Sequence, residues 1–204
     1  RDSNKYYPNN KITINDNVTL TAVYGETSKL ISITYYNNFG TPYKAVTVPD
    51  IPNNGLITVK TYDEIGLAKR EGYTFAGWNT KDDGTGDKFE AGENARVDNT
   101  ETNDLYAQWT ANDAKITFVT NGGSAVADMT GKTGDAISSR TMPTTTKSGY
   151  TFGGWFDNEG LTGTAVTKLP ETFPAGTTTY YAKWTANDAK ITFVTNGGSA
   201  VADM

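Results

Sequence analysis

The residues best suited to chemistry are the carboxylates of one short polar segment, which are Asp82, Asp83, Asp87, Glu90 and Glu93. Oxygen-rich loops of this kind bind calcium, and paired carboxylates cleave glycosidic bonds. An EF-hand loop built around Gly84 would need an acidic or amide ligand where Lys81 stands. We therefore favour a solvated loop over a calcium site, and we predict no bound metal.

Catalytic chemistry is also limited by the residue types that the chain lacks. It has no cysteine and no histidine, which removes thiolate nucleophiles, serine–histidine triads and most transition-metal sites. No acidic pair recurs in the second copy of the pattern, which offers only Asp157 and Glu159. The sequence implies no convergent polar pocket, so we expect neither an enzyme nor a cofactor.

The charge distribution argues against two kinds of partner. The 204 residues include 23 acidic and 18 basic ones, and the basic ones are scattered singly. A protein that binds duplex nucleic acid presents a basic stripe, so we expect no nucleic-acid partner. No apolar run approaches the roughly 20 residues of a membrane span, so we expect no membrane insertion.

The chain repeats itself, and the repeat defines its organisation. Trp109–Met129 recurs without one difference as Trp184–Met204, and EGYTFAGW at 71–78 corresponds to SGYTFGGW at 148–155. The join between the units is short, which predicts modules held at a restricted angle. We therefore predict two complete units between two partial ones: the tail of a preceding unit at 1–25, complete units at 26–110 and 111–185, and the head of a following unit at 186–204.

Each unit is expected to open with a strand and a turn. KITFVTNGG at 115–123 alternates apolar and polar residues before a glycine-rich turn, which predicts a hairpin. In the first unit Thr61 and Glu64 form a capping box at the start of one short helix, and Gly72 is its expected end. In the second unit we expect only a turn or two of helix around 136–141.

Two further strands complete the unit. GYTFAGW is expected to point Tyr73 and Phe75 to one side of the sheet and Trp78 to the other. The closing strand LYAQW at 105–109 places alternate residues, ending with Trp109, on one face. Hairpin, short helix and further strands together predict an α+β, strand-rich fold, with a sheet over a helix in the β-grasp manner.

The aromatic residues allow more than one interpretation. The four tryptophans, Trp78, Trp109, Trp155 and Trp184, could stack on sugars, but each lies within a strand pattern, so we favour core packing. Tyr35, Tyr36 and Tyr43 are peculiar to the first unit, and strand alternation turns some of them outward. They are our candidates for ligand contacts, against the more ordinary interpretation as cross-strand aromatic pairs.

The segments GYTFAGW and GYTFGGW, followed by LYAQW or YYAKW and preceded by ITFVTNGGS, resemble the Listeria–Bacteroides repeat family, also called the internalin B-type repeat. The resemblance covers both complete units and both partial ends. This chain departs from the family pattern in its longer first unit and in Tyr24, which stands in place of a tryptophan.

The resemblance implies tandem ubiquitin-like β-grasp modules in an elongated array, carried by large secreted or wall-anchored bacterial proteins that are often adhesins. It implies no catalytic residues. The hallmark residues to which it gives a structural role are Gly72, Tyr73, Phe75, Gly77, Trp78 and Trp109 in the first unit, and Gly149, Tyr150, Phe152, Gly154, Trp155 and Trp184 in the second.

These observations lead to two hypotheses about function. The first is a non-catalytic repeat stalk of an adhesin, extracellular on the bacterial cell surface or cell wall, that spaces and presents a binding domain. The alternative is a repeat module that itself binds a host-cell protein or glycan through a sheet face, a sheet edge or the loop after Trp78. We also expect the partial ends to pack on the adjoining units or to self-associate head to tail with another chain.

Overall fold

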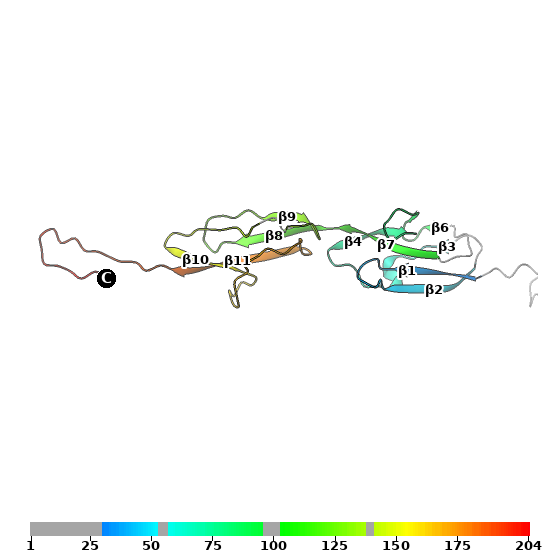
Figure 1. Ribbon diagram of the computed structural model, residues 1–204, viewed down its shortest axis with the longest axis horizontal. Coiled ribbons are helices and arrows are strands. Elements are labelled where there is room, and N and C mark those ends of the chain that lie inside the picture. Colours follow the sequence, from blue (N-terminus) through cyan, green and yellow to red (C-terminus); the bar gives the residue numbers. More distant parts are fainter. Residues whose placement is uncertain (1–29, 53–56, 96–102, 138–140) are drawn as a thin grey trace, which may run out of the picture.

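The computed structural model describes residues 30–52, 57–95, 103–137 and 141–204. In this part of the chain, two sheets lie end to end along an elongated molecule (Figure 1). We call residues 30–111, which hold the first sheet, the first module, and residues 113–186, which hold the second, the second module. The prediction of a strand-rich chain is confirmed at this coarse level, because the described residues contain almost no helix.

The first module is built on a five-stranded sheet. In sheet order its strands are β2 (Ala45–Pro52), β1 (Leu30–Tyr36), β7 (Asn103–Ala111), β4 (Tyr73–Asn79) and β5 (Lys88–Phe89). A separate pair joins β3 (Ile57–Thr58) to β6 (Asn94–Ala95). The opening strand β1 and the closing strand β7 run parallel, with Ile33 opposite Asn103 and Tyr36 opposite Tyr106.

The second module repeats this plan with four strands. In sheet order they are β10 (Tyr150–Phe156), β11 (Thr177–Ala186), β8 (Asp113–Val119) and β9 (Met129–Lys132). The opening strand β8 pairs in parallel with the closing strand β11 from Lys115 opposite Thr177 to Val119 opposite Tyr181. Both modules therefore place their first and last strands side by side inside the sheet.

The turns after the opening strands contain the left-handed residues that the sequence predicts. Asn121 and Gly122 have φ angles of 48° and 88°, and Asn38 has a φ angle of 54°. Asparagine tolerates this conformation and glycine adopts it freely. In the second module this turn does not close a tight hairpin. Ile116 pairs with Met129, so the connection is longer than predicted.

The prediction that Trp78 points away from Phe75 is wrong. The pairing of β4 with β7 shifts register between Phe75 and Trp78, and Gly77 in this bulge has a φ angle of 109°. A bulge inserts one extra residue and reverses the alternation beyond it. Trp78 and Phe75 therefore share the core face, with ring centroids 5.0 Å apart.

Strand β10 contains the same device. Its pairing with β11 shifts between Phe152 and Trp155, and Gly154 has a φ angle of 100°. The rings of Phe152 and Trp155 lie 5.5 Å apart. A glycine at this point of the strand thus aims two aromatic residues at the core in each module.

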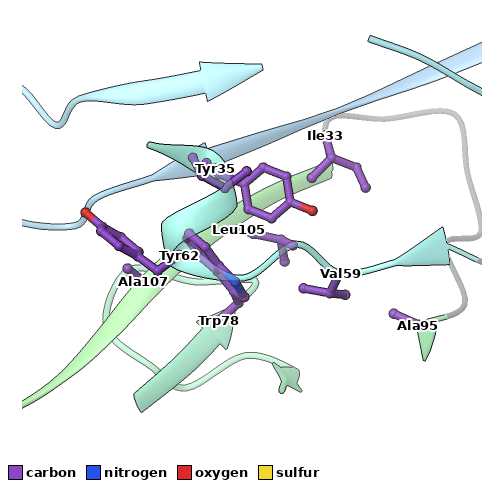
Figure 2. Close-up of a cluster of buried hydrophobic side chains, with 9 residues drawn as sticks. Ile33, Tyr35, Val59, Tyr62, Trp78, Ala95, Leu105 and Ala107 are labelled. Atoms are coloured by element: carbon purple, nitrogen blue, oxygen red, sulfur yellow. The ribbon is translucent and has the colours of Figure 1, made fainter. Parts of the chain in front are cut away.

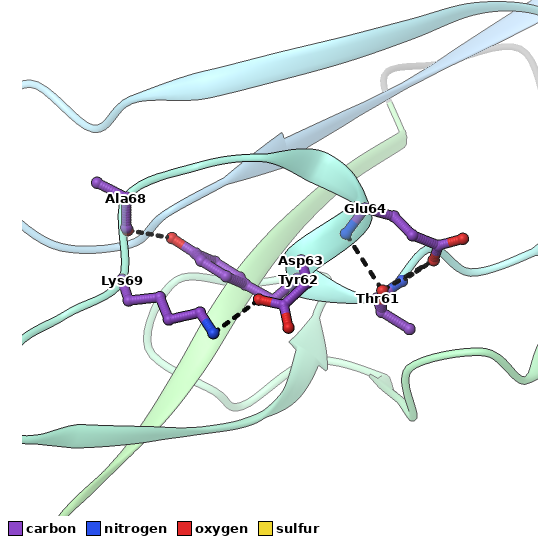
Figure 3. Close-up of polar contacts among 6 residues, drawn as sticks. All are labelled: Thr61, Tyr62, Asp63, Glu64, Ala68 and Lys69. Atoms are coloured by element: carbon purple, nitrogen blue, oxygen red, sulfur yellow. Dashed lines mark hydrogen bonds and ion pairs between the residues drawn. The ribbon is translucent and has the colours of Figure 1, made fainter.

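The helix α1 (Tyr62–Ile65) is shorter than predicted (Figure 3). Its capping box is present: the Thr61 backbone N–H donates to Glu64 Oε2 at 2.7 Å, and the Glu64 N–H donates to Thr61 Oγ1 at 3.3 Å. The helix ends at Gly66, with a φ angle of 72°, and not at Gly72. A left-handed residue cannot continue a right-handed helix, so the first such glycine ends it.

The second module has no helix among its described residues. At the place where we expected a turn or two of helix, Ala136 forms a bridge with Thr172. Residues 138–140 lie outside the described part of the chain. The chain here runs instead through Pro143, which lacks the N–H that helical hydrogen bonding needs.

Each module has its own hydrophobic core. In the first, the fully buried members are Ile33, Tyr35, Val59, Trp78 and Ala107 (Figure 2). In the second they are Ile116, Ile137, Trp155, Phe173 and Ala182. Burial of one large apolar side chain contributes about 1.5–3 kcal/mol, so these clusters supply the main stabilisation of each module.

Candidate functional site: the joint between the two modules

Trp78 and Trp155 lie inside the two cores, where they are 1% and 2% exposed, and the partly buried Trp109 and Trp184 pack against them. Each indole N–H donates to a backbone carbonyl at 2.8 Å; the acceptors are Lys60, Asn37, Pro143 and Thr120. A buried indole needs such a partner, and each bond ties a loop to a strand.

The other hallmark pair of the motif, Gly72 and Tyr73, has a different environment. The Tyr73 hydroxyl donates a hydrogen bond of 3.1 Å to the backbone carbonyl of Thr133, which belongs to the second module. A Cβ atom on Gly72 would lie 2.6 Å from Thr133 Cγ2 and 2.8 Å from Ala175 Cβ. These two residues therefore form a contact between modules and not a part of the core.

One residue connects the two sheets. Strand β7 ends at Ala111, β8 begins at Asp113, and Asn112 lies between them. The Asn112 N–H donates to the Gly72 carbonyl at 2.9 Å, and the Asn112 carbonyl accepts the Thr133 N–H at 2.9 Å. The Asn112 side chain also accepts the Thr74 hydroxyl at 2.7 Å. The linking residue is thus bonded to both modules.

The turn that meets Tyr73 is specific in shape. A Cβ atom on Gly134 would lie 2.6 Å from the Tyr73 hydroxyl, and Gly134 has a φ angle of 88°. On the other side of the ring, the Arg70 guanidinium lies 3.7 Å from the Tyr73 ring centroid, which is a cation–π geometry. We call Gly72, Tyr73 and Asn112 the socket, and Thr133–Gly134 the docking turn.

The docking turn carries one unusual group. Thr133 is 9% exposed, and its hydroxyl Oγ1 has no hydrogen-bond partner among the described residues. Leaving a buried hydroxyl unpaired costs about 1–3 kcal/mol. The unpaired Thr133 hydroxyl therefore lowers the stability of the joint.

Sequence reasoning gave Gly72 and Tyr73 a structural role but missed the docking turn. Thr133 and Gly134 lie in the segment GKTGD, whose glycine indicates a turn but not what the turn touches. The contact joins positions far apart in the chain, so no local pattern reports it. The single polar residue between two alternating strands, Asn112, was the available signal.

The second module has the same socket without a docking turn. The Asn187 N–H donates to the Gly149 carbonyl at 2.9 Å, and the Thr151 hydroxyl donates to Asn187 Oδ1 at 2.6 Å. Lys147 Nζ lies 4.4 Å from the centroid of the Tyr150 ring. However, Tyr150 is 42% exposed, and a Cβ atom on Gly149 would meet nothing within 4 Å.

Of the three tyrosines predicted to contact a ligand, Tyr35 is not on the surface. It lies 1% exposed in the first core, with its ring 4.8 Å from Trp78 (Figure 2). Its hydroxyl accepts the Lys60 N–H at 3.2 Å, and burial raises its pKa. Residues on one strand alternate between faces, so the burial of Tyr35 places the neighbouring Tyr36 on the outer face.

Tyr36 and Tyr43 lie with a third tyrosine on the outside of the first sheet. The rings of Tyr36 and Tyr106 stack with centroids 4.7 Å apart, and Tyr43 meets Tyr106 edge-on at 6.3 Å. Burial, then the charges of Asp104 and Asp82, raise the pKa of Tyr106. We call Tyr36, Tyr43 and Tyr106 the tyrosine cluster; it is a small aromatic surface beside the carboxylates of Asp104 and Asp82.

The acidic segment is divided by β5: Asp82, Asp83 and Asp87 lie in the loop between β4 and β5, whereas Glu90 and Glu93 lie between β5 and β6. The Asp83 carboxylate accepts the backbone N–H and the hydroxyl of Thr85 at 2.9 and 2.7 Å, and these bonds lower its pKa. The Asn79 amide donates to the carbonyls of Gly84 and Gly86. Across the described residues, no three acidic, histidine or cysteine side chains are grouped to hold a metal ion.

A shallow depression of about 390 Å³ lies beside α1, between Tyr62 and Tyr73. The charged residues at its edge, Asp63 and Lys69, pair with each other at 2.8 Å (Figure 3). In the described part of the chain, no helix has the length and apolar character needed to cross a bilayer.

Comparison with known proteins identifies similar sequences. The model of a family described as the Listeria-Bacteroides repeat domain matches residues 32–108 and 115–183. A relative described as a Gly-rich membrane protein, from Evansella cellulosilytica, is 39% identical over 149 residues, which are 72% of this chain and 16% of the relative. Internalin H from Listeria monocytogenes is 37% identical over 120 residues, 58% of this chain and 20% of the relative.

A second protein of Evansella cellulosilytica, described as a membrane protein, is 36% identical over 103 residues, 49% of this chain and 14% of the relative. The chain therefore spans a fifth or less of the length of these relatives. No solved structure matches the chain. The two matched ranges of the repeat domain fall one in each module.

Proposed function

We propose, from the premise that this chain belongs to the Listeria-Bacteroides repeat family, that it is a non-catalytic stalk segment of a bacterial adhesin. It stands outside the cell, on the surface or cell wall, and it spaces and presents a binding domain. The similarity to an internalin and to two membrane-protein relatives supports this location. The units proposed for it are complete repeats at 26–110 and 111–185, flanked by a tail at 1–25 and a head at 186–204.

We assign a β-grasp fold to each complete unit. The support is a hairpin at the start, a closing strand parallel to the opening strand, and, in the first module, a short helix packed on the sheet. The described part of residues 26–110 contains a five-stranded sheet and the separate pair β3–β6, and that of residues 111–185 contains one four-stranded sheet. The tail at 1–25, including Tyr24, lies outside the described residues.

The joint between the modules is the observation that carries the stalk proposal. Flexible linkers are longer and rich in glycine and serine, whereas here only Asn112 separates the two sheets. Asn112 is bonded to Gly72 on one side and to Thr133 on the other. The Tyr73 hydroxyl adds a third restraint. A joint restrained in this way holds the modules end to end, as a spacer requires.

Small-angle scattering with a matched pair of variants tests the stalk. Tyr73→Ala removes the ring and the hydroxyl that meet the docking turn, whereas Tyr150→Ala removes the equivalent residue from an open socket. We expect an elongated particle for the parent chain and for Tyr150→Ala. We expect a broader distribution of interatomic distances for Tyr73→Ala. A compact parent particle, or identical curves for the two variants, contradicts the stalk.

The same scattering series, run against protein concentration, tests self-association. Residues 188–204 expose apolar side chains, among them Ile191 at 56% and Val194 at 79%. We propose that such ends pair head to tail with another copy of the chain. The particle mass then grows with concentration. A constant mass over the whole series contradicts the pairing.

The tyrosine cluster favours the second candidate function, a module that binds a host-cell protein or glycan. Tyr43 is 39% exposed beside the stacked rings of Tyr36 and Tyr106. Such rings offer flat apolar faces next to the Asp82 carboxylate, whose Oδ2 accepts the Tyr43 hydroxyl at 3.4 Å. In the second module the residue opposite Tyr181, which corresponds to Tyr106, is Val119, so no stack forms there.

This alternative is tested by binding of fluorescently labelled chain to cultured mammalian cells. The variants are Tyr36→Ala and Tyr43→Ala, with Tyr181→Ala as the matched control in the second module. We expect loss of cell binding for the first two and no change for the control. Equal binding by all variants contradicts a binding role for the tyrosine cluster.

A further inference from the structure

The end of the second module presents a socket whose other half is absent from the described chain. Gly149, Tyr150 and Asn187 correspond to Gly72, Tyr73 and Asn112, and their shared hydrogen bonds agree within 0.1 Å or better, as in the 2.9 Å bond of each Asn N–H to each Gly carbonyl. The cation over the ring is also retained, as Lys147 in place of Arg70. What differs is that Tyr150 remains exposed.

The observed joint shows what such a socket recognises. One residue, Thr133, donates its N–H to the Asn112 carbonyl and accepts the Tyr73 hydroxyl with its own carbonyl. The next residue must be glycine, because any Cβ on Gly134 would lie 2.6 Å from the Tyr73 hydroxyl. The socket therefore binds the backbone groups of a turn. In that turn a glycine follows a residue that is small enough to lie against Gly72.

Residues 188–204 begin the element that would carry such a turn. Their sequence is identical to 113–129. The backbone pair Ile191–Met204 repeats the pair Ile116–Met129, and Lys190 pairs with Asp203 as Lys115 pairs with Asp128.

The turn of this hairpin is repeated as well. Asn196 and Gly197 have φ angles of 47° and 99°, close to those of their counterparts in the second module. The Thr195 hydroxyl donates to the Gly198 carbonyl at 3.0 Å, as the Thr120 hydroxyl donates to Gly123 at 3.1 Å. Residues 188–204 therefore repeat the turn, one backbone pair and one ion pair of the opening hairpin, although none of them is assigned to a strand.

The apolar side of this hairpin is exposed to solvent, as the socket is. Ile191 is 56% exposed where Ile116 is fully buried, and Phe193 is 42% exposed where Phe118 is 6% exposed. One occupant completes both surfaces. The remainder of a repeat, continued from Met204, buries the hairpin and brings its own Thr-Gly turn to Tyr150, four residues further on, as Thr133 follows Met129.

We propose that Gly149, Tyr150 and Asn187 form a docking site for the Thr-Gly turn of a further repeat, in the geometry of the first joint. The inference rests on the proposed stalk, and it names the residues by which the stalk propagates. The Gly-Tyr motif, with the asparagine after the closing strand, thus forms the socket by which each unit binds the next one. Successive units then follow one another with a single rotation and rise, set by backbone contacts.

The test completes the third unit by adding a copy of residues 130–185 after Met204 of the full chain. The chain has no cysteine, so spin labels are introduced in pairs at exposed equivalent positions. One pair, at Ala76 and Thr130, spans the first joint. The other, at Gly153 and the threonine that follows Met204, spans the second. Electron–electron dipolar spectroscopy gives the distance distribution of each pair.

We expect two narrow distributions with the same mean. Tyr150→Ala should broaden only the second, and Tyr73→Ala only the first. A narrow first and a broad second distribution, whether the added unit is undocked or unfolded, overturns this inference and leaves the stalk. A narrow second distribution with a different mean also overturns it. A broad first distribution in the parent chain contradicts the stalk itself.

Discussion

The two modules have equivalent cores, but different side chains cover one side of each core. In the first, Tyr62 on α1 lies against the sheet, with its ring 5.7 Å from Trp78 and 5.2 Å from Phe75. In the second there is no helix among the described residues, and Ile137 and Phe173 fill the core. The strands with their bulge glycines are shared. The difference shows that the aromatic framework is fixed, whereas the connection that covers it varies.

The largest expected effect tests the shared framework. Trp78→Ala and Trp155→Ala each remove a fully buried side chain and its indole hydrogen bond, which costs about 3–5 kcal/mol of unfolding free energy. We expect each substitution to destabilise its own module, measured by urea unfolding followed by near-UV circular dichroism. Tyr150→Ala, at an exposed ring, is the control. A cost below about 1 kcal/mol at either tryptophan contradicts equivalent cores.

A smaller effect tests the bulges. Gly77→Ala and Gly154→Ala place a side chain at φ angles of 109° and 100°, a strain of about 1–3 kcal/mol. A Cβ at position 154 would also lie 2.8 Å from Ala165 Cβ, whereas at 77 the nearest atom is the Phe89 carbonyl oxygen at 3.1 Å. We expect Ala165→Gly to recover part of the loss in Gly154→Ala. Additive stabilities in this double-mutant cycle would rule out the contact.

A still smaller effect concerns the helix α1, which distinguishes the first module from the second. Tyr62→Phe removes a 2.7 Å hydrogen bond to the Ala68 carbonyl, worth about 0.5–1.5 kcal/mol, from the first module only. Burial raises the pKa of Tyr62 to about 12, above its ordinary value of 10.0. The unfolded state therefore releases this proton first, and stability falls as pH rises from 10 to 12. We expect a shallower fall in the Tyr62→Phe variant, measured by urea unfolding at each pH; parallel curves contradict this account.

The smallest expected effect has the opposite sign. Thr133→Val replaces an unpaired buried hydroxyl with a methyl group of similar shape. We expect a gain of about 1 kcal/mol, at the low end of the cost of an unpaired buried hydroxyl because Thr133 is still 9% exposed. Thr145→Val is the matched control, since the buried Thr145 hydroxyl donates to the Ser124 carbonyl at 2.7 Å and its loss should destabilise. A loss of stability in Thr133→Val would mean that the hydroxyl has a partner.

Some parts of this structure follow from the sequence and others do not. The strand segments, the capping box at Thr61 and the left-handed turn at Asn121 are local, so residue spacing indicates them. Strict alternation through Gly77 does not predict the bulge, although a glycine within a strand is itself a signal for one. The end of α1 at Gly66 could not be told from an end at Gly72, because both glycines adopt the left-handed conformation that ends a helix.

The joint was beyond local reasoning for a different reason. Gly72 and Thr133 belong to different modules and lie far apart in the sequence, and neither residue type indicates its partner. The division between Tyr35 and Tyr36 depends on which face of β1 is buried. Alternation shows that they differ but not which one is inside. The repeat was the more informative signal, because a contact observed in one unit predicts the same contact at the equivalent residues of another unit.

The parallel pairing of the first and last strands in each module has a mechanical consequence. A pull on the two ends of a module drags β1 against β7, or β8 against β11, along their length in opposite directions. The slanted, evenly spaced bonds of a parallel pair then stretch together and not one after another. A chain of such modules that is pulled at its two ends is loaded in shear at every module, and the joint lies in series with that load.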